Sequence, residues 1–568
     1  MNLLPDWIKS YRTELLAGDL TAGLIVTVML IPQSLAYAML AGLPPEIGLY
    51  ASVLPLFAYA LLGSSMTLAV GPVAVASLMT ASALAPLAEP GSAEYIALAI
   101  KLSMLSGVML LVFGVLRLGF LAYFLSHPVI SGFISGSAIL ITVSQLKHLF
   151  GVQASNSNVL ATLNDLFINI SDANPATTAI GLISLGFLFF ARKNLGQLLQ
   201  KTGLSAGTSA LLGRLAPMVA VILSIVVVSQ FELDGHAKVS IVGNVPQGLP
   251  DLQFLIPSGT DLTNLWLPAL LISLVGFVES VSVAQSLALK RQQKIKPDRE
   301  LLGLGAANLA SAFSGGYPVT GGFARSVVNF SAGANTPLAG VLSAILMAVV
   351  IASMTGLFYH LPQAVLSATI IVAVTSLIDV KTLKETWHYD RADFLSLITT
   401  LLGVIILGVE AGVILGVVMS LAALVWRSSH PHMAVVGRVP GTEHFRNIKR
   451  HKVDTLPELL ALRVDESLFF ANAALVQEKI EAMVAADPGL RYVLLLCPAV
   501  NQIDSTALEA LTQLHASLQA KNAKFMLAEV KGPVMDRLQH TELGHKLEGN
   551  IFLSANEAFN YVHQQQHT

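Results

Sequence analysis

The sequence contains little charge and a single cysteine. Only 12% of its 568 residues are charged, 54% are hydrophobic, and the formal net charge is −2. The lone cysteine, Cys497, excludes a disulfide within the chain, and its apolar neighbours predict a buried structural thiol. Because no basic excess is present, no nucleic-acid partner is expected. This composition is not that of an ordinary soluble protein.

The few charges are concentrated in the last quarter of the chain. The 138 residues from Pro431 onward hold 13 of the 33 Lys and Arg residues and 15 of the 35 Asp and Glu residues. The charge density of this tail is roughly twice that of the preceding part of the chain. We therefore expect a membrane domain over residues 1–430 and a soluble domain over residues 431–568.

The first part of the chain divides into apolar runs of membrane-spanning length. A helix needs about 20 mainly apolar residues to cross the hydrocarbon core of a bilayer. When shorter runs interrupted by Gly or Pro are included, we predict about fourteen transmembrane helices in a multi-pass protein. Clear examples are residues 20–40, 96–116, 265–289, 338–358 and 394–408.

The connections between these runs alternate in charge. With fourteen spans and the amino terminus inside, the even-numbered connections face the cytoplasm, where positive charge accumulates. Connection 290–299 carries five Lys and Arg residues, whereas the preceding connection, 232–261, carries four Asp and Glu residues. The pattern predicts an inner (plasma) membrane protein with both termini in the cytoplasm.

The soluble tail alternates strand-like and helix-like stretches. Strands are predicted over 459–464, 492–496 and 524–530, and amphipathic helices over 473–484 and 505–519. A small α/β domain of roughly 130 residues fits this alternation. The tail lacks a glycine-rich phosphate loop, paired carboxylates with a catalytic partner, and Cys/His spacing for a metal. We interpret it as a regulatory or assembly module rather than an enzyme.

Two stretches interrupt the apolar runs in the same way. LAVGPVAVASLM at residues 68–79 and SGGYPVTGGFARS at residues 314–326 each place small residues and a proline before a run that can start a helix. Proline suits the first turn of a helix, so each stretch is predicted to begin a half-helix inside the membrane. A helix amino terminus offers unpaired N–H donors and the positive end of the helix dipole. Together the two stretches predict an anion site.

One spacing relates these breaks to two polar residues. Pro72 and Pro318 are 246 residues apart, and the same offset carries Gln33 of the first span onto Glu279. An internal repeat of about seven helices would produce this relation, and such repeats are common in transporters.

The residues expected to contact the anion come from the two breaks and the first span. Backbone N–H groups are the first choice, at Val73, Ala74, Gly321 and Gly322. Side chains are the second choice, at Gln33, Tyr37 and Thr320. For Tyr37, ordinary helix packing or a place in the interfacial aromatic belt stays open as an alternative.

Two charged residues lie in or beside these segments. Glu279 sits in the middle of a span, and an intramembrane carboxylate normally faces a cavity or a partner. We interpret it as a proton-accepting or cation-coupling group or as the counter-ion of Arg325, with a structural polar pair as the alternative. Arg325 is expected about two turns into the second half-helix. It could contact the anion, extend to the interface, or pair with Glu279.

At these motifs the sequence resembles the sulfate permease (SulP) family of anion transporters. The stretch PQSLAYAMLAGLPPEIGLYASVLP at residues 32–55 is close to the signature of that family. AVGPVAVASLM, GFVESVSVAQSLA and PVTGGFARSVVNFSAGANTP match later family blocks in the same order. In the tail, NQIDSTALEALTQLHASL resembles the conserved segment of a STAS domain, which anti-sigma factor antagonists also contain. The resemblance covers nearly the whole chain.

The resemblance implies a fold and a site. It implies seven plus seven helices in inverted repeats, divided into a core and a gate domain, in a protein that is commonly a homodimer. It places the anion between the amino ends of the third and tenth helices, here the stretches that begin at Pro72 and Pro318. The first-helix Gln and aromatic positions of the family correspond to Gln33 and Tyr37, and its eighth-helix acidic position corresponds to Glu279.

Two departures from the family pattern affect individual residues. Many relatives carry a serine directly before the tenth-helix arginine, where this chain has Ala324, so backbone contacts must suffice there. In the tail, Ser505 and Thr506 are followed by Ala507 instead of the glycine of the anti-sigma antagonists. Phosphorylation of Ser505 or Thr506 is therefore one hypothesis, beside a cytosolic regulatory partner, and Asp504 is expected to cap the following helix.

The interpretation that unites these observations is a secondary active transporter of small anions, most simply sulfate. Acidic residues near the site occur in family members that couple to cations, so Glu279 points to proton symport, with sodium as the weaker candidate. Bicarbonate, chloride and C4-dicarboxylates are the nearest alternatives, because backbone donors discriminate poorly among small anions. A nucleobase permease and a membrane-anchored anion sensor are more remote. No metal or organic cofactor is expected.

Overall fold

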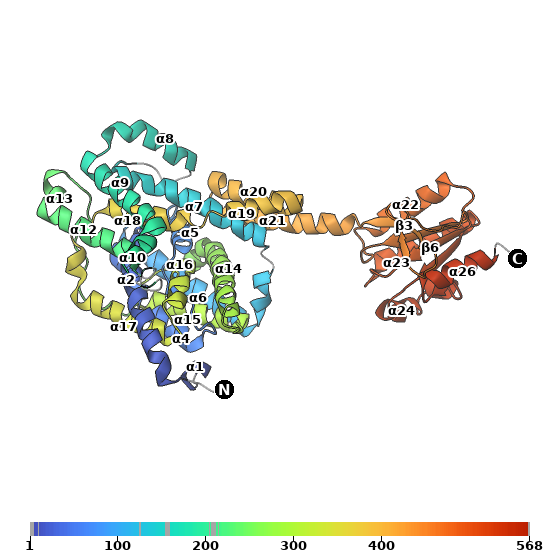
Figure 1. Cartoon of the computed structure of the whole chain (residues 1–568), viewed down its shortest axis with the longest axis horizontal. Helices are drawn as coiled ribbons and strands as arrows, with labels where there is room; N and C mark the ends of the chain where they lie inside the picture. Colours follow the sequence, from blue (N-terminus) through green and yellow to red (C-terminus); the bar gives the residue numbers. More distant parts are fainter. Residues whose placement is uncertain are drawn as a thin grey trace. The chain divides into compact units, whose positions relative to one another are not determined.

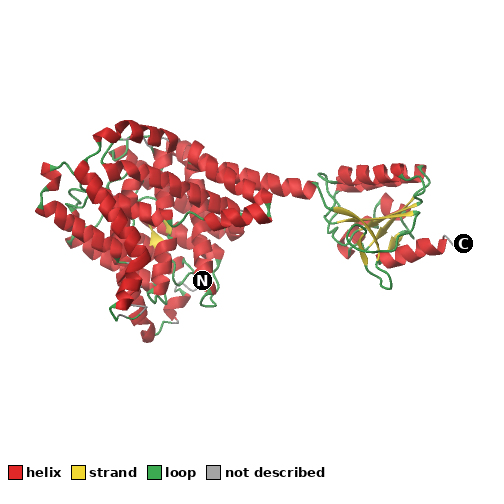
Figure 2. Ribbon diagram, turned by 45° about the horizontal axis from the view of Figure 1, so that its top comes forward, coloured by secondary structure: helices red, strands yellow, loops and turns green. Residues whose placement is uncertain are grey.

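The chain divides into two compact units, Met1–Ser420 and Leu421–Thr568, which are described separately (Figure 1). The computed structural model describes residues 5–9, 11–123, 126–153, 159–203, 205, 209, 212–213 and 215–565. Helix α21 (Val409–Ser429) begins in the first unit and ends in the second, one residue before the expected domain limit at 430. Figure 2 shows a first unit built almost entirely of helices and a second unit built on a sheet.

The first half of the membrane unit contains both long apolar helices and shorter ones. One of the shorter helices, α5, is largely buried and follows a two-residue strand, β1, in the chain. The elements are α1 (Asp6–Lys9), α2 (Leu16–Leu40), α3 (Pro45–Tyr50), α4 (Leu54–Leu62), β1 (Val70–Gly71), α5 (Ala74–Leu84), α6 (Ala93–Val115), α7 (His127–Phe150), α8 (Val159–Asn169), α9 (Pro175–Phe190), α10 (Gly196–Lys201), α12 (Ala216–Gln230) and α13 (Leu233–His236).

The second half repeats the pattern of a two-residue strand followed by a short helix. Here the strand is β2 and the short helix is α16. The elements are α14 (Gly259–Leu289), α15 (Pro297–Phe313), β2 (Thr320–Gly321), α16 (Phe323–Ser331), α17 (Leu338–Ser353), α18 (Gln363–Thr375), α19 (Val380–Tyr389) and α20 (Arg391–Leu407), followed by α21.

The membrane unit has the helices that a multi-pass protein requires. Among the described residues, eight helical segments are long and apolar enough to cross a membrane, and three shorter helices are also apolar. The longest of the eight is α14, with 31 residues. The prediction of many spanning helices is therefore confirmed, while the number fourteen stays a prediction.

Small residues allow close packing between helices α6 and α15. A Cβ atom added at Gly107 would lie 2.8 Å from the backbone N of Leu309, and one added at Gly305 would lie 2.8 Å from that of Leu111. Both glycines therefore bring the two backbones closer than any side chain would permit. Small residues serve this purpose at helix interfaces in membranes, where apolar burial does not drive association.

Two carboxylates are completely buried in the membrane unit and fully hydrogen-bonded. Glu300 of α15 accepts bonds from the Tyr59 hydroxyl (2.7 Å), the Ser64 N–H (2.8 Å) and hydroxyl (2.6 Å), and the Ser65 N–H (3.0 Å). Asp19 of α2 accepts bonds from the Asn335 N–H (2.6 Å) and from the Thr336 N–H and hydroxyl (3.0 and 2.7 Å). Each carboxylate fastens a connecting segment to a helix.

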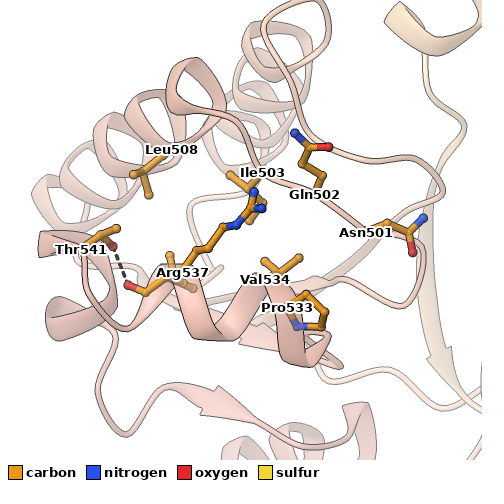
Figure 3. A pocket seen from close by; sticks show the side chains of 9 residues that line it. Asn501, Gln502, Ile503, Leu508, Pro533, Val534, Arg537 and Thr541 are labelled. Carbon is orange, nitrogen blue, oxygen red and sulfur yellow. Dashed lines mark hydrogen bonds between the residues drawn. The ribbon is translucent and has the colours of Figure 1, made fainter. Parts of the chain in front are cut away.

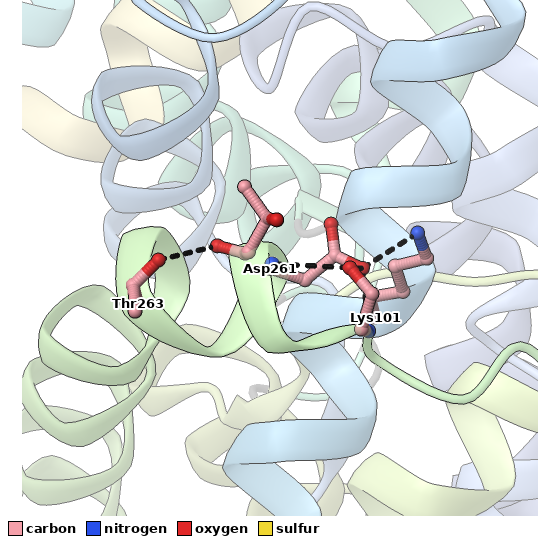
Figure 4. A network of polar contacts seen from close by, with 5 residues as sticks. Lys101, Asp261 and Thr263 are labelled. Carbon is pink, nitrogen blue, oxygen red and sulfur yellow. Dashed lines mark hydrogen bonds and ion pairs between the residues drawn. The ribbon is translucent and has the colours of Figure 1, made fainter.

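An ion pair joins the beginning of α14 to α6 (Figure 4). The Lys101 ammonium lies 2.9 Å from Asp261 Oδ2, and the two side chains are only 22% and 12% exposed. The same Asp261 oxygen accepts hydrogen bonds from the N–H and the hydroxyl of Ser258, which completes a capping box at the first turn of α14. The charge of Asp261 is thus used structurally.

The second unit is an α/β domain with a mixed six-stranded sheet. The strand order is β4-β3-β5-β6-β7-β8, in which β5 to β8 are parallel and β3 pairs antiparallel with β4 and β5. The elements are β3 (Met433–Arg438), β4 (Phe445–Asn447), β5 (Leu459–Val464), α22 (Ala473–Ala486), β6 (Tyr492–Leu496), α23 (Ser505–Ala520), β7 (Lys524–Ala528), α24 (Gly532–Leu538), α25 (Glu542–Lys546), β8 (Ile551–Phe552) and α26 (Ala555–Gln565).

Successive residues of the central strands face opposite sides of this sheet. Leu460, Leu462 and Val493 belong to the apolar core formed with α22 and α23, whereas Leu459 and Ala461 belong to the core formed with α26. Helices therefore cover both faces, which explains why these strands read as continuous apolar runs. The three predicted strands and two predicted helices are confirmed to within two residues at each end. Burial raises the pKa of Cys497 to about 12, in agreement with a structural thiol.

Candidate anion-binding site

The two short helices begin inside the protein, directly after the strands β1 and β2. Val73 precedes α5 with φ −134° and ψ 151°, and Gly322 precedes α16 with φ −86° and ψ 128°, so the chain is extended before each helix. The prolines were expected in the first turns, but Pro72 comes one residue before this Val73 and Pro318 comes four residues before Gly322. The helices start later because residues 70–71 and 320–321 pair with each other as a ribbon.

Hydrogen bonds hold the two breaks together as one piece. Val70 pairs with Gly321 and Gly71 with Thr320 in an antiparallel ribbon. Around it, the Gly322 N–H donates to the Ala69 carbonyl (3.0 Å), and the Ala69 N–H donates to the Ser326 hydroxyl (2.9 Å). The amide of Asn329 donates to the Thr67 carbonyl (3.0 Å). Segments separated by about 250 residues in the sequence therefore form a single rigid support.

In each short helix, the backbone N–H groups of the first three residues are free of hydrogen bonds within the helix. The first hydrogen bonds within the helices run from Ser77 to the Val73 carbonyl and from Ser326 to the Gly322 carbonyl. Neither helix has a side-chain capping bond from any described residue. The earlier N–H groups consequently have no acceptor in the helix. They belong to Ala74, Val75, Ala76, Phe323, Ala324 and Arg325.

Part of the predicted contact set is used internally. The N–H of Gly321 donates to the Ser280 hydroxyl at 2.9 Å, and that of Gly322 donates to Ala69, so neither of these predicted amide contacts is free. The Thr320 hydroxyl shares a hydrogen bond with Ser280 (2.7 Å) and donates to the Gly276 carbonyl (2.9 Å). These residues fasten β2 to α14 and thereby support the site from behind.

All the predicted contact residues except Thr320 and Gly321 meet around one small cavity of about 50 Å³. Helix α2 contributes Gln33 and Tyr37, which are 7% and 8% exposed. Helix α14 contributes Glu279. The two half-helices contribute the other predicted residues, which are Val73, Ala74, Gly322 and Arg325.

Arg325 lies in the first turn of α16, where it is the third residue, and not two turns into the helix. Its side chain is 2% exposed, which excludes the interpretation that it extends to the membrane interface. Nη1 donates a 2.6 Å hydrogen bond to the carbonyl of Pro72, on the opposite break. Nε and Nη2 have no hydrogen-bond partner among the described residues. Arg325 thus links the two breaks and keeps two buried donor atoms unused.

Space for this guanidinium depends on two glycines. A Cβ atom added at Gly322 would lie 3.1 Å from Arg325 Nη2, and one added at Gly71 would lie 3.4 Å from the same atom. Gly71 also has φ +148°, a conformation that other residues rarely adopt. A side chain at Gly71 or Gly322 would therefore crowd the charged group.

Glu279 lines the same cavity as Arg325, but no hydrogen bond or ion pair joins these two described residues. Its Oε2 is buried and has no hydrogen-bond partner in the part of the chain that the structure describes. Because the Nε and Nη2 atoms of Arg325 are also without partners there, these atoms do not form the predicted direct pair. Glu279 also borders a second, apolar space of about 20 Å³ between α7, α14 and α21. The carboxyl group thus sits on the wall between a polar and an apolar cavity.

Sequence reasoning missed one whole side of the cavity. Ala373, Val374 and Leu377 of and after α18 line it, together with Val75 and Phe323 of the half-helices. The α18 residues carry no polar group that could have marked them in the sequence. Val75 and Phe323 could have been found, because they follow Ala74 and Gly322 directly at the predicted helix starts.

In the second unit, Asp504 acts as the predicted cap of α23. Its Oδ1 accepts a hydrogen bond from the Ala507 N–H (2.8 Å), and its Oδ2 accepts one from the Phe470 N–H (2.8 Å). Ser505 and Thr506, the predicted phosphorylation positions, are exposed in the first turn of this helix. No group of His, Cys, Asp and Glu that could hold a metal occurs within the described ranges.

A pocket of about 120 Å³ lies between α23 and α24 (Figure 3). Its walls are mainly apolar, from Ile503, Leu508, Val534 and Leu538, and Arg537 is its single charged residue. The Thr541 hydroxyl at its edge donates to the Leu538 carbonyl at 2.6 Å. Residues 501–503 line the pocket and come directly before Asp504 in the chain. The pocket therefore adjoins the segment that resembles the STAS family.

Comparisons with known proteins agree with both units. Residues 16–400 match the sulfate permease family, and residues 450–558 match the STAS domain. The chain is 35% identical over 536 residues to "Sulfate transporter 4.1, chloroplastic" of Arabidopsis thaliana, covering 92% of this chain and 76% of the relative. It is 33% identical over 549 residues to "Probable sulfate transporter MT1781" of Mycobacterium tuberculosis, covering 96% and 95%.

Solved structures share the fold at lower identity. The murine Solute Carrier 26 family member A9 anion transporter in the inward-facing state has a TM-score of 0.88 at 21% identity, covering 99% of this chain and 94% of that one. The transmembrane domain of a cyanobacterium bicarbonate transporter, BicA, has a TM-score of 0.60 at 24% identity, covering 72% and 98%. The family match spans most of the membrane unit and contains both helix breaks. The chain therefore belongs to the sulfate permease family of membrane anion transporters and is a transporter, not an enzyme.

Proposed function

We propose that this transporter carries sulfate, bound between the amino ends of α5 and α16. The observation that carries the proposal is the buried guanidinium of Arg325, whose Nε and Nη2 have no hydrogen-bond partner among the described residues and which lies beside the first-turn amides of the two half-helices. Unused buried donors cost about 1–3 kcal/mol each. An anion that accepted their hydrogen bonds would recover this free energy, and the two helix dipoles would add to its attraction.

The donor set suits an oxyanion with several acceptors. The amides of Ala74 and Val75 approach from one side and those of Phe323 and Ala324 from the other, while Arg325 supplies the one fixed positive charge. A tetrahedral dianion has oxygens in four directions and can accept from both helix ends at once. Several relatives of 31–35% identity are named sulfate transporters, which supports sulfate over other anions.

Glu279 is the proposed coupling group. A carboxylate beside the cavity would repel a dianion, whereas the protonated carboxyl group would not. Protonation of Glu279 would therefore favour anion binding, and transport would carry a proton with the anion. Sodium is the second candidate ion, because a carboxylate oxygen can also bind a cation.

Movement of one group of helices against the other would carry the anion across the membrane. Because the ribbon between β1 and β2 joins α5 to α16, the two helix ends must move together as a core. Helix α18, which closes the cavity on the opposite side, would belong to the gate. We further propose a homodimer in the plasma membrane with both termini in the cytoplasm, and regulation through the STAS domain at Ser505 or Thr506 or by a cytosolic partner.

Uptake of radiolabelled sulfate into proteoliposomes tests the function and its coupling. We expect an inward proton gradient to accelerate uptake by the native protein, and Glu279→Gln to transport at a rate that no longer responds to the gradient. Full gradient dependence in Glu279→Gln would refute the coupling role. An imposed sodium gradient in the same vesicles distinguishes the two candidate ions.

A competition panel decides the substrate. Sulfate, bicarbonate, chloride, oxalate, succinate and fumarate are each tested against the labelled anion at two pH values. If bicarbonate, chloride or a dicarboxylate competes more strongly than unlabelled sulfate, that anion is the preferred substrate and the proposal for sulfate is wrong. Binding without flux would instead favour an anion sensor, and transport of a nucleobase would favour a permease for uncharged rings.

A further inference from the structure

A second and larger cavity lies beside the candidate site. It measures about 470 Å³ and is bounded by α2, α9, α10, α12, α18 and the π-helical segment Ala191–Leu195 that connects α9 to α10. Its lining mixes apolar, amide and basic side chains. Among them are Met29, Leu188, Arg192, Lys193, Gln197 and Val372.

The charged residues that line this cavity, among those the structure describes, are all basic. Residues 173–231, which include α9, α10 and α12, contain four Lys and Arg residues and no Asp or Glu. Two of the four, Arg192 and Lys193, line the cavity. Lys201 ends α10, and Arg214 lies outside the described residues. A cleft lined by uncompensated positive charge concentrates anions.

The two cavities adjoin each other on two helices. Met29 borders the larger cavity and Gln33 borders the candidate site, and these residues are one turn, about 6 Å, apart on the same face of α2. On α18, Val372 borders the larger cavity and the next residue, Ala373, borders the candidate site. The two cavities are therefore neighbours along α2 and α18.

Arg192 stands at the boundary between them. Its Nη1 donates a 2.9 Å hydrogen bond to the carbonyl of Val372. This bond uses one of the five N–H donors of a guanidinium. The π-helical segment that carries Arg192 inserts an extra residue into the helix, a feature found often at functional sites. Lys193, next in the chain, is exposed and adds a second positive charge at the mouth.

We propose that Arg192 and Lys193 form a second oxyanion-binding site, which passes the transported anion to and from the cavity at Arg325. The inference rests on the proposed function and extends it. A lipid phosphate has the same chemistry as sulfate and is the other source of such a ligand. Continuity with the candidate site along α2 and α18 favours the transported anion.

Equilibrium binding of radiolabelled sulfate to the purified full-length protein tests this site. The native protein should bind two sulfates per chain, and the double variant Arg192→Gln/Lys193→Gln should bind one. In proteoliposomes of phosphatidylcholine, the double variant should raise the KM for sulfate about tenfold, the effect of losing one or two charge-assisted hydrogen bonds, with little change in kcat.

Two single variants make the result specific. Lys201→Gln removes the same charge from the same acid-free segment but not from the cavity lining, so its KM should stay close to that of the native protein. Arg192→Lys keeps the positive charge and should retain the second sulfate. An equal effect of Lys201→Gln would attribute the result to general surface potential and overturn the proposal. Unchanged stoichiometry and affinity in the double variant would overturn it as well.

The same binding measurement distinguishes a lipid headgroup from the transported anion. If added phosphatidylglycerol displaces the second sulfate from the native protein, the site belongs to lipid headgroups and the proposal for a transported anion is wrong. Failure of the proposed function looks different, because the native protein then binds no sulfate at all. In that case, binding is measured with the anion that competes most strongly in the competition panel. Equal binding of that anion by the native protein and the double variant would refute the second site.

Discussion

The membrane unit buries charged groups in two contrasting ways. At Glu300 and Asp19, which are both 0% exposed, the carboxylate oxygens accept three or four hydrogen bonds from backbone and hydroxyl groups. At the candidate site, Arg325 and Glu279 keep three buried polar atoms without partners among the described residues. The first pair is fully hydrogen-bonded within the protein, whereas the second pair keeps unused polar atoms beside the cavity.

This difference separates structural from functional charge more clearly than burial does. All four residues lie in the membrane unit, so other interactions must offset the desolvation free energy of each charged side chain. For Glu300 and Asp19, hydrogen bonds made during folding do so. Arg325 and Glu279 lack part of that stabilisation, which under the proposed function an anion and a proton would supply. The following predictions test this distinction, beginning with the largest effect.

Replacing Arg325 should abolish transport with little effect on stability. In Arg325→Gln the only fixed cation of the cavity is lost, and two or more charge-assisted hydrogen bonds to the anion with it, so we expect sulfate uptake to fall at least about 100-fold. The lost bond to Pro72 is offset because a buried charge is also removed. Uptake and thermal unfolding are measured on the same preparation. A stable variant that retains near-native uptake would show that Arg325 only links the two breaks and does not bind the anion.

Replacing Glu300 should instead lower the stability of the protein and leave transport nearly unchanged. Glu300→Gln presents an amide NH₂ group to donors that previously met carboxylate oxygens, which leaves one or two of them unsatisfied. We expect the protein to lose about 2–4 kcal/mol of stability. Thermal unfolding in detergent measures this loss, and uptake per folded molecule at low temperature should stay near the native value. A variant of native stability and impaired uptake would place Glu300 in the transport machinery.

The amino ends of α5 and α16 should contribute comparably to sulfate binding, although only α16 carries a charged side chain there. Ala74→Pro and Phe323→Pro each remove one free N–H at the first helical position, after a residue that is already extended as proline requires. Each should weaken sulfate binding about tenfold. Ala74→Gly and Phe323→Ala keep the N–H and serve as controls. An effect at α16 alone would mean that the anion rests on only one helix end.

The exposed ion pairs of the second unit should show the smallest effect. Partial burial opposes ionisation of Asp465, but hydrogen bonds from Arg463 and His432 outweigh it and lower its pKa below the usual 3.8. The ionised carboxylate thus stabilises the fold above that pH, and the stabilisation is lost as pH falls through the lowered pKa. In Asp465→Asn we expect less than about 1 kcal/mol of local destabilisation near neutral pH.

Amide hydrogen exchange along β3 and β5 in the full-length protein measures this small change. Native protein and Asp465→Asn should differ slightly at neutral pH and become indistinguishable in strong acid. A difference as large as that expected for Glu300→Gln would show that exposure is a poor guide to the value of a charge in this protein.

Much of this architecture could be predicted from the sequence because it leaves periodic or compositional signals. The apolar runs, the small α/β tail, the paired breaks and the convergence of Gln33, Glu279 and Arg325 all follow from residue type and spacing. The exact helix starts did not, because the ribbon between residues 70–71 and 320–321 forms only when the two halves meet. The Gly322 N–H is also used by the opposite break, at the Ala69 carbonyl, while the Gly321 N–H donates to Ser280 of α14.

Two other features left no signal that a single sequence could reveal. The α18 side of the cavity is made of Ala373, Val374 and Leu377, which are indistinguishable from lipid-facing or packing residues. The full hydrogen bonding of Glu300 and Asp19 depends on contacts more than 200 positions away in the chain. The sequence alone does not show how many hydrogen bonds these carboxylates or Glu279 accept.

The ribbon that pairs Val70 with Gly321 makes the anion site a seam between the two halves of the polypeptide. A chain cut in the connection 238–258 would give two fragments, each with one helix end, and neither would own a complete binding surface. A substitution near one helix end therefore changes a cavity whose other wall belongs to the opposite half of the chain.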